Sequence, residues 1–128
     1  MQTLIITGEM VDLNTYVNAE RGNRYHAAAM KKAETERVYW ACKEQHLTPM
    51  PEGISLIQCD WYTKDLRKDG DGLSFGLKAI YDGLVLAGVL PNDSRRYTGS
   101  IHHTFAVDKE RPRVVIALHE CLLQSAAS

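Results

Sequence analysis

The alternation of apolar and polar positions predicts four β-strands. Residues 3–7 form a short apolar segment typical of a first strand, and residues 54–62 place Ile57, Cys59 and Trp61 on one face with polar side chains on the other. Two further strands alternate in the same way near the end of the chain. Their apolar faces carry Ile101, His103, Phe105 and Val107 on one strand and Val114, Ile116 and Leu118 on the other.

A first helical region extends from about Thr15 to Gln45, which is rich in helix-forming residues. We expect Asn14 to cap its start, because an Asn side chain accepts hydrogen bonds from the free amides of the next turn. Gly22-Asn23 is a candidate break that would divide the region into a short and a long helix. The predicted buried stripe of the long helix consists of Met30, Ala33, Trp40 and Ala41.

A second helix, beginning near Leu73, has the clearest periodicity in the chain. Gly88 lies where a left-handed C-cap is expected, and Pro91 prevents the helix from continuing. Its apolar residues are Leu73, Leu77, Ile80, Tyr81, Leu84 and Val85. The order β-α-β-α-β-β predicts a single small α+β domain over residues 1–120, with two main helices on a mixed sheet. Residues 121–128 form a tail without an informative pattern.

Composition narrows the function classes. The chain has 128 residues, and its 15 Lys and Arg against 16 Asp and Glu give a formal net charge of −1. This argues against a strongly basic protein that coats nucleic acid indiscriminately. Cys42, Cys59 and Cys121 are odd in number and form no C-x-x-C motif, so we expect small buried hydrophobic residues. No segment is long enough to span a membrane and no signal peptide is evident, which predicts a cytoplasmic protein without a membrane partner.

Asp69 and Asp71 suggest a metal site in the loop before the second helix. Glycines at 70 and 72 let this loop bend, so that both carboxylates can point to one place. Asp93 lies in the loop after that helix, and it can join them only if its loop folds back or the helix is short. Aspartates from separate loops fit Mg²⁺ in phosphodiester hydrolysis.

Two other interpretations of the loop stay open. Asp and Gly are common turn residues, so the segment could be a solvated charged turn. A calcium-binding loop of the EF-hand type, in a regulatory domain, is disfavoured because Arg67 and Lys78 would occupy its first and twelfth positions, where carboxylates are needed. Lys78 itself either extends to solvent or stabilises charge on a scissile phosphate.

The segment from Arg67 to Asp93 resembles the RusA family of Holliday junction resolvases. The family signature is a basic residue, D-x-D-N, a helix of the form K-x-x-x-D-x-L-x-x-A-G, and a D-D or N-D pair. The resemblance implies that Asp69, Asp71 and Asp93 are catalytic metal ligands for Mg²⁺, with Mn²⁺ as a substitute. It also implies that Lys78 is the catalytic lysine, and that a homodimer nicks opposing strands of a four-way DNA junction.

One departure from the signature supports an alternative function. Gly72 stands where the family has Asn, which removes one hydrogen bond around the metal ligands. A catalytically weak or inactive module that binds branched DNA or a protein partner without cutting is therefore a second hypothesis.

Basic side chains near the motif are candidates for contacts with DNA phosphates, although each set could equally be a solvated surface. The candidates are Arg67, Lys68, Arg95, Arg96, Lys31 and Lys32. Three aromatic residues, Trp40, Trp61 and Phe105, are expected in the core rather than as platforms for stacked bases.

Overall fold

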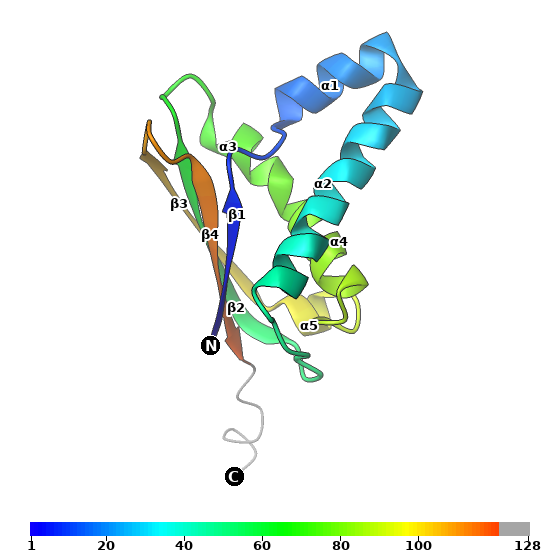
Figure 1. The fold of residues 1–128 in the computed structure, drawn as a ribbon, viewed down its shortest axis with the longest axis vertical. Helices are drawn as coiled ribbons and strands as arrows, with labels where there is room; N and C mark the ends of the chain where they lie inside the picture. The colour runs from blue at the N-terminus through cyan, green and yellow to red at the C-terminus, as the bar shows by residue number, and fades with distance from the viewer. Residues whose placement is uncertain (121–128) are drawn as a thin grey trace.

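The protein folds as a four-stranded mixed sheet with helices packed against one face. The computed structural model describes residues 1–120, so the predicted tail lies outside the described residues. The strands are β1 (Gln2–Thr7), β2 (Ile54–Thr63), β3 (Ser100–Val107) and β4 (Arg113–Glu120). They are arranged in the order β1-β4-β2-β3, in which β2 and β3 are parallel and the other pairs are antiparallel. This confirms the predicted α+β fold (Figure 1).

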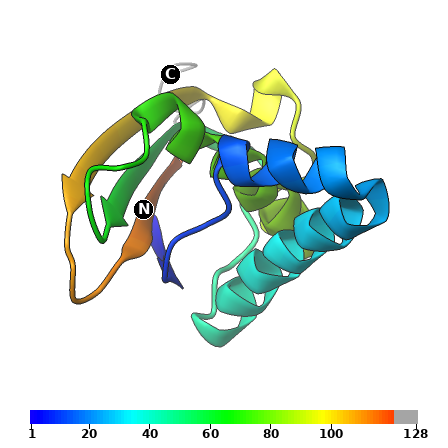
Figure 2. The same cartoon turned by 90° about the horizontal axis from the view of Figure 1, so that it is seen from above.

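The helices form a second layer on the sheet (Figure 2). They are α1 (Leu13–Gly22), α2 (Arg24–Glu44), α3 (Gly70–Leu73), the 3-10 turn η1 (Ser74–Gly76), α4 (Leu77–Leu86) and α5 (Arg95–Thr98). The core lies between the sheet and the pair α2 and α4, where Leu4, Ile57 and Ile116 meet Val38 and Leu84. The candidate chemistry lies at the edges of this core, on α3, on α4 and in the loops beside them.

The first helical region breaks at Asn23, as the sequence predicts. The Asn23 side chain accepts hydrogen bonds from the amides of Tyr25 and His26, and so caps α2. The predicted cap at Asn14 is wrong, because α1 already begins at Leu13, with Asp12 before it.

The predicted buried stripe of α2 is only partly right, because Met30 and Ala41 are half-buried and Ala41 packs against the core, whereas Ala33 and Trp40 are exposed. Its buried residues are Ala27, Val38 and Cys42, whereas the side chain of Trp40 is 59% exposed. The reason is the close approach of α4, because a Cβ added at Gly83 would lie 2.4 Å from atoms of Val38. A helix that packs along so narrow a strip buries small residues and leaves Trp40 outside the core.

The second predicted helix is interrupted but keeps its buried stripe. It is divided into α3, η1 and α4, and Leu73, Ile80 and Leu84 are all buried. Gly88 has a φ of +78°, which confirms the predicted left-handed position after the helix.

The sheet faces follow the predicted alternation, but the helical layer covers β3 only in part. Trp61 is 2% exposed and lies in the core as predicted. Phe105 is its partner on β3 and shares its face, yet Phe105 is 47% exposed, so the prediction of a core position for it is wrong. β3 is the last strand of the sheet, and most of its length extends beyond the helices.

Two of the cysteines are buried free thiols, as predicted. Burial raises the pKa of the Cys42 thiol to about 11 and that of the Cys59 thiol to about 12. Cys121 lies outside the described residues. None of the helices described in residues 1–120 has the length and hydrophobicity needed to cross a membrane.

Candidate active site

Asp69 and Asp71 lie at the start of α3, where the chain leaves the β2–α3 loop. The carbonyl of Asp69 accepts a hydrogen bond from the amide of Leu73 at 3.0 Å, which closes the first helical turn. The Asp71 carboxylate accepts from the adjacent Gly72 amide at 2.9 Å. Both residues are exposed, and neither forms an ion pair with any other part of residues 1–120. Two negative charges are thus held close together in sequence without a protein cation.

The two glycines of this motif differ in their surroundings. A Cβ added at Gly70 would lie 3.1 Å from ring atoms of Phe105, so the backbone of α3 rests directly on that ring. A Cβ added at Gly72 would meet nothing within 4 Å. Gly70 is therefore packed tightly against this ring, whereas Gly72 leaves room for a side chain.

Residues 67–78 do not form an EF-hand loop. From Gly70 onward the chain is already helical, first in α3 and then through η1 into α4. A calcium loop needs these residues to wrap around the ion in an extended turn. An EF-hand loop at these residues is therefore wrong.

Lys78, on the first turn of α4, is paired with two carboxylates. Its Nζ atom lies 2.7 Å from Oδ2 of Asp93 and 3.0 Å from Oδ1 of Asp82. The hydrogen bonds that Lys78 donates to Asp93 and to Asp82 raise the pKa of Lys78, and the bond to Asp93 lowers the pKa of that carboxyl. Asp82 was not a predicted site residue, although its position four residues after Lys78 on a helix is the spacing of a favourable ion pair.

The loop after α4 does fold back, as a shared site with Asp93 requires. α4 has only ten residues and is about 15 Å long, and the following loop returns so that Asp93 reaches a side chain from the first turn. It reaches Lys78, however, and not the aspartates of α3. Among residues 1–120, no three His, Cys, Asp or Glu side chains are grouped closely enough to hold a metal ion.

A hard divalent cation therefore fits the observed donors in part. Asp69 and Asp71 offer carboxylate oxygens, the ligands that Mg²⁺ and Mn²⁺ prefer, and both lack a protein cation within the described residues. The charge of Asp93 is balanced by Lys78. The assignment of all three aspartates as metal ligands stays a prediction.

Lys68 contacts a pair of acids that sequence reasoning missed. Its Nζ lies 3.3 Å from Oε1 of Glu9 and 3.8 Å from Oδ1 of Asp12, whose side chains are largely buried. Asp12 also accepts a hydrogen bond from the Thr15 hydroxyl. Glu9 and Asp12 lie between β1 and α1, so these contacts hold the loop before α3 against the segment that follows β1. The only sequence signal was two acids directly after an apolar strand.

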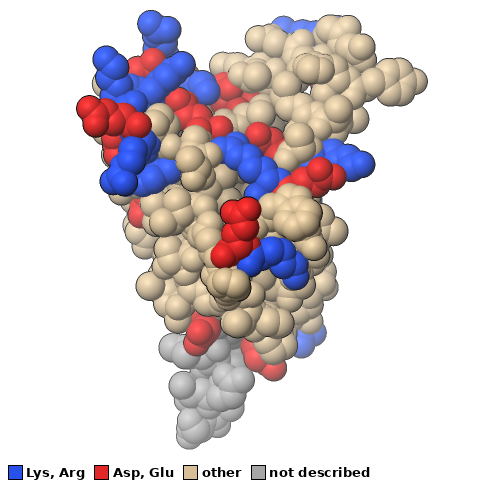
Figure 3. Space-filling view, in the orientation of Figure 1, with Lys and Arg blue, Asp and Glu red and all other residues tan. Residues whose placement is uncertain are grey.

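The other predicted phosphate-binding residues come from separate elements. Arg67 is exposed and lies 3.7 Å from Asp65 in the same loop. Arg95 and Arg96 are exposed on α5, and Lys32 is exposed on α2. Figure 3 shows acidic and basic side chains mixed around the β2–α3 loop and the neighbouring β3–β4 turn, rather than a uniformly positive surface.

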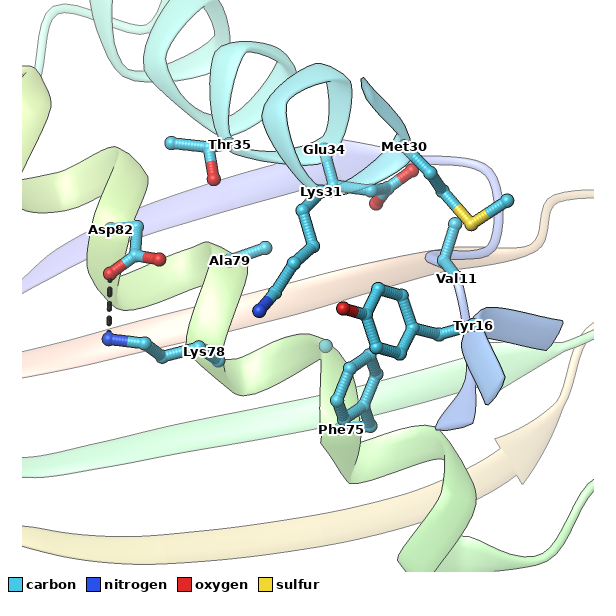
Figure 4. Close-up of a pocket in the computed structure, with 11 residues that line it drawn as sticks. Val11, Tyr16, Met30, Lys31, Glu34, Thr35, Phe75, Lys78, Ala79 and Asp82 are labelled. Carbon is cyan, nitrogen blue, oxygen red and sulfur yellow. Dashed lines mark ion pairs between the residues drawn. The ribbon is translucent and has the colours of Figure 1, made fainter. Parts of the chain in front are cut away.

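A pocket between α1, α2 and α4 opens beside Lys78 (Figure 4). The rings of Tyr16 and Phe75 form one wall, with their centroids 5.3 Å apart. The Nζ of Lys31 lies 5.3 Å from the centroid of the Tyr16 ring. Lys78 and Asp82 lie on the opposite side of this pocket. The structure thus brings Lys31 and Lys78 to the same pocket, a proximity that their separation in sequence did not indicate.

Comparison with known proteins adds no support for the resemblance to the RusA family, which rests on the residues described above. No protein-family model and no curated protein sequence matches the chain.

Proposed function

We propose that the protein is a metal-dependent, structure-selective endonuclease that resolves Holliday junctions in the cytoplasm as a homodimer, in DNA recombination and repair. The observation that carries this proposal is the contact between Lys78 and Asp93 at 2.7 Å, which links the helix and the return loop of the motif. It accompanies two exposed aspartates on α3 that have no cation partner in the described residues. This combination favours chemistry on a phosphate over a purely solvated turn.

Asp69 and Asp71 would hold Mg²⁺ or Mn²⁺ in this function. When bound, such an ion lowers the pKa of a coordinated water and polarises the phosphate. Lys78 donates hydrogen bonds through its ammonium group, which is charged at neutral pH, and it would offset the negative charge that develops on the departing oxygen. Asp82 and Asp93 orient that ammonium group from two sides.

Lys68 and Arg67 would contact the DNA backbone at the loop that carries the aspartates, and Lys31 would contact it at the pocket beside Lys78. Arg95 and Arg96 on α5 are further candidates for phosphate contacts. Because phosphate contacts carry no sequence information, the selectivity for a branched substrate would come from its shape.

A module that binds branched DNA or a protein partner without cutting it is a second candidate. The observation that favours it is that Lys78 already neutralises Asp93, so that the third predicted ligand is occupied. In this function the same basic residues would hold the DNA and no bond would be broken.

The deciding experiment uses a synthetic four-way junction with labelled strands. The protein is incubated with it in the presence of Mg²⁺ and in the presence of a chelator, beside an Asp71→Asn variant. We expect paired nicks that require Mg²⁺ and are lost in the variant. Glu36→Gln, at an exposed position on α2, is the control and should cut normally. A shifted but uncut junction with every protein would favour the binding module instead.

A further inference from the structure

Two acids between β1 and α1 lie mostly inside the molecule. The side chain of Asp12 is 6% exposed, and that of Glu9 is 16% exposed. A carboxylate that leaves water is costly unless a cation or hydrogen-bond donors surround it. Of the cations in residues 1–120, only Lys68 forms an ion pair with either acid. Both acids therefore share one lysine of the β2–α3 loop.

The Asp12 carboxylate is directed toward that loop and not toward the helix that it precedes. Asp12 is the N-cap residue of α1, a position where an Asp side chain usually accepts hydrogen bonds from the first free amides of the helix. It makes no such bond here, and accepts instead from the Thr15 hydroxyl beside Lys68. The Glu9 carboxylate likewise lies 3.5 Å from the Lys64 amide of the same loop.

Lys68 is directed inward, unlike the residues on either side of it. Arg67 and Asp69 are exposed, whereas the side chain of Lys68 is half-buried against the two acids. From Gly70 onward α3 has other supports, because Gly70 packs on a core-side ring and Leu73 is buried. Consecutive Cα atoms lie about 3.8 Å apart, so fixing residue 68 restricts where the next residue can lie. Asp69 therefore depends on the contact between Lys68 and the acids.

We propose that Glu9 and Asp12 hold Lys68 and so fix the position of Asp69, the first candidate metal ligand. The acids act through the lysine and would not touch the metal, which makes them positioning residues. The Lys68 side chain is still 33% exposed, so its ammonium group can also donate to a DNA phosphate. The role toward a metal rests on the proposed function, whereas the placement of Asp69 is a property of the metal-free protein.

The first test is hydrogen exchange in the metal-free protein. The Leu73 amide reports the first turn of α3, because it donates to the carbonyl of Asp69 at 3.0 Å. We expect Lys68→Gln to speed exchange of this amide at least about tenfold, since residue 68 is released. The Ala87 amide at the end of α4 serves as the reference for general stability, and its exchange should change much less. Equal acceleration of both amides, or none at Leu73, would overturn the proposal.

Lys64→Gln is the matched control. It removes the same charge from the same loop, at an exposed side chain that has no ion pair in residues 1–120. It should leave the exchange of the Leu73 amide unchanged. If it accelerates that exchange as much as Lys68→Gln does, the contact with the acids has no special role.

Mn²⁺ affinity, measured by calorimetry, separates positioning from charge. Removing a lysine near two carboxylates would by itself raise their affinity for a cation, because a repulsion is lost. We expect Lys68→Gln instead to weaken Mn²⁺ binding about tenfold, as the loss of a group that orients a ligand does, and Lys64→Gln not to weaken it. Lys68→Arg keeps the charge and the donors and should restore most of the native affinity. An affinity that rises in both Gln variants would overturn the proposal.

Glu9→Gln and Asp12→Asn keep the proposal testable if Lys68→Gln does not fold. Each retains the lysine and an acceptor oxygen, so each should accelerate exchange at Leu73 by a smaller factor. Native exchange in both would overturn the proposal. A native protein that binds no Mn²⁺ would instead refute the proposed function, and the exchange measurement would still decide whether the acids fix Asp69.

Discussion

The two ends of the segment from α3 to α4 hold their carboxylates in opposite ways. At the α3 end, Asp69 and Asp71 are exposed and have no cation partner in the described residues. At the α4 end, Asp82 and Asp93 share the ammonium group of Lys78. The first end keeps a net negative charge that can attract a cation, whereas at the second end the protein supplies the cation itself. In the function we propose, this difference would separate metal binding from phosphate chemistry along one short helical segment.

Replacing Lys78 should have the largest effect on the difference between the two ends. We expect Lys78→Gln to reduce junction cleavage at least about 100-fold, because an oriented charge at the reacting phosphate is lost. The same change releases Asp93, so Mn²⁺ affinity, measured by calorimetry, should increase. The two readouts thus move in opposite directions. Folding should be nearly unaffected, since the side chain is 56% exposed.

Lys109→Gln, in the β3–β4 turn, is the control for the Mn²⁺ measurement. It removes the same positive charge from the protein at an exposed position without an ion pair in residues 1–120. If both variants raise the affinity equally, the effect is one of net charge. The idea that Lys78 holds Asp93 away from a metal would then be wrong.

The second prediction concerns the pKa of Asp93. The expected change is of intermediate size and can be measured without substrate. Its pKa is lowered from the ordinary value of 3.8 by the hydrogen bond from Lys78. A lowered pKa means that the contribution of the pair to stability is present above pH 3.8 and is lost as the pH falls through the lowered value. In Lys78→Gln, carboxyl NMR should show the pKa of Asp93 rising toward 3.8.

Asp108 provides an internal reference in the same spectra. Asp108 lies in the β3–β4 turn, and its pKa is lowered by the hydrogen bond from Arg113 at the start of β4, so it should not change when Lys78 is replaced. An Asp93 pKa that also stays unchanged would show that the contact with Lys78 is not maintained in solution.

Local sequence patterns correctly predicted the features that depend on a single helix or strand. The faces of β2 and β4 and the stripe of α4 followed from alternation and helical spacing, because a sheet face or helix stripe repeats within its own sequence. The same is true of the helix break at Asn23 and the left-handed Gly88.

What the patterns missed depends on the neighbours of an element. Alternation correctly predicted the face of the sheet on which Phe105 lies. It could not predict that this part of the face is half-exposed, because cover depends on where the helices end. The buried face of α2 was set by the close approach at Gly83. Lys78 and Asp93 are 15 residues apart, and Lys68 and Glu9 are 59 apart, so no local spacing indicates which acid each lysine contacts.

Gly72 offers the smallest and most specific change at the α3 end. An Asn side chain there meets no atom of the protein within 4 Å of its Cβ, and Asn favours a helix over Gly by a few tenths of a kcal/mol. We expect Gly72→Asn to raise the cleavage rate a few-fold by adding a hydrogen-bonding group beside Asp69 and Asp71, with a slight rise in the unfolding temperature.

Gly70→Asn is the matched control on the same turn. Its Cβ would press on the Phe105 ring at 3.1 Å, so it should displace α3 and lower both the cleavage rate and the unfolding temperature. Opposite effects at these two glycines would show that a side chain at position 72 can support the metal ligands. They would also show that position 70, packed on Phe105, has no space for a side chain. A Gly72→Asn rate at or below that of the native protein would instead mean that the native glycine already serves the site, and that the departure from the family signature is not a defect.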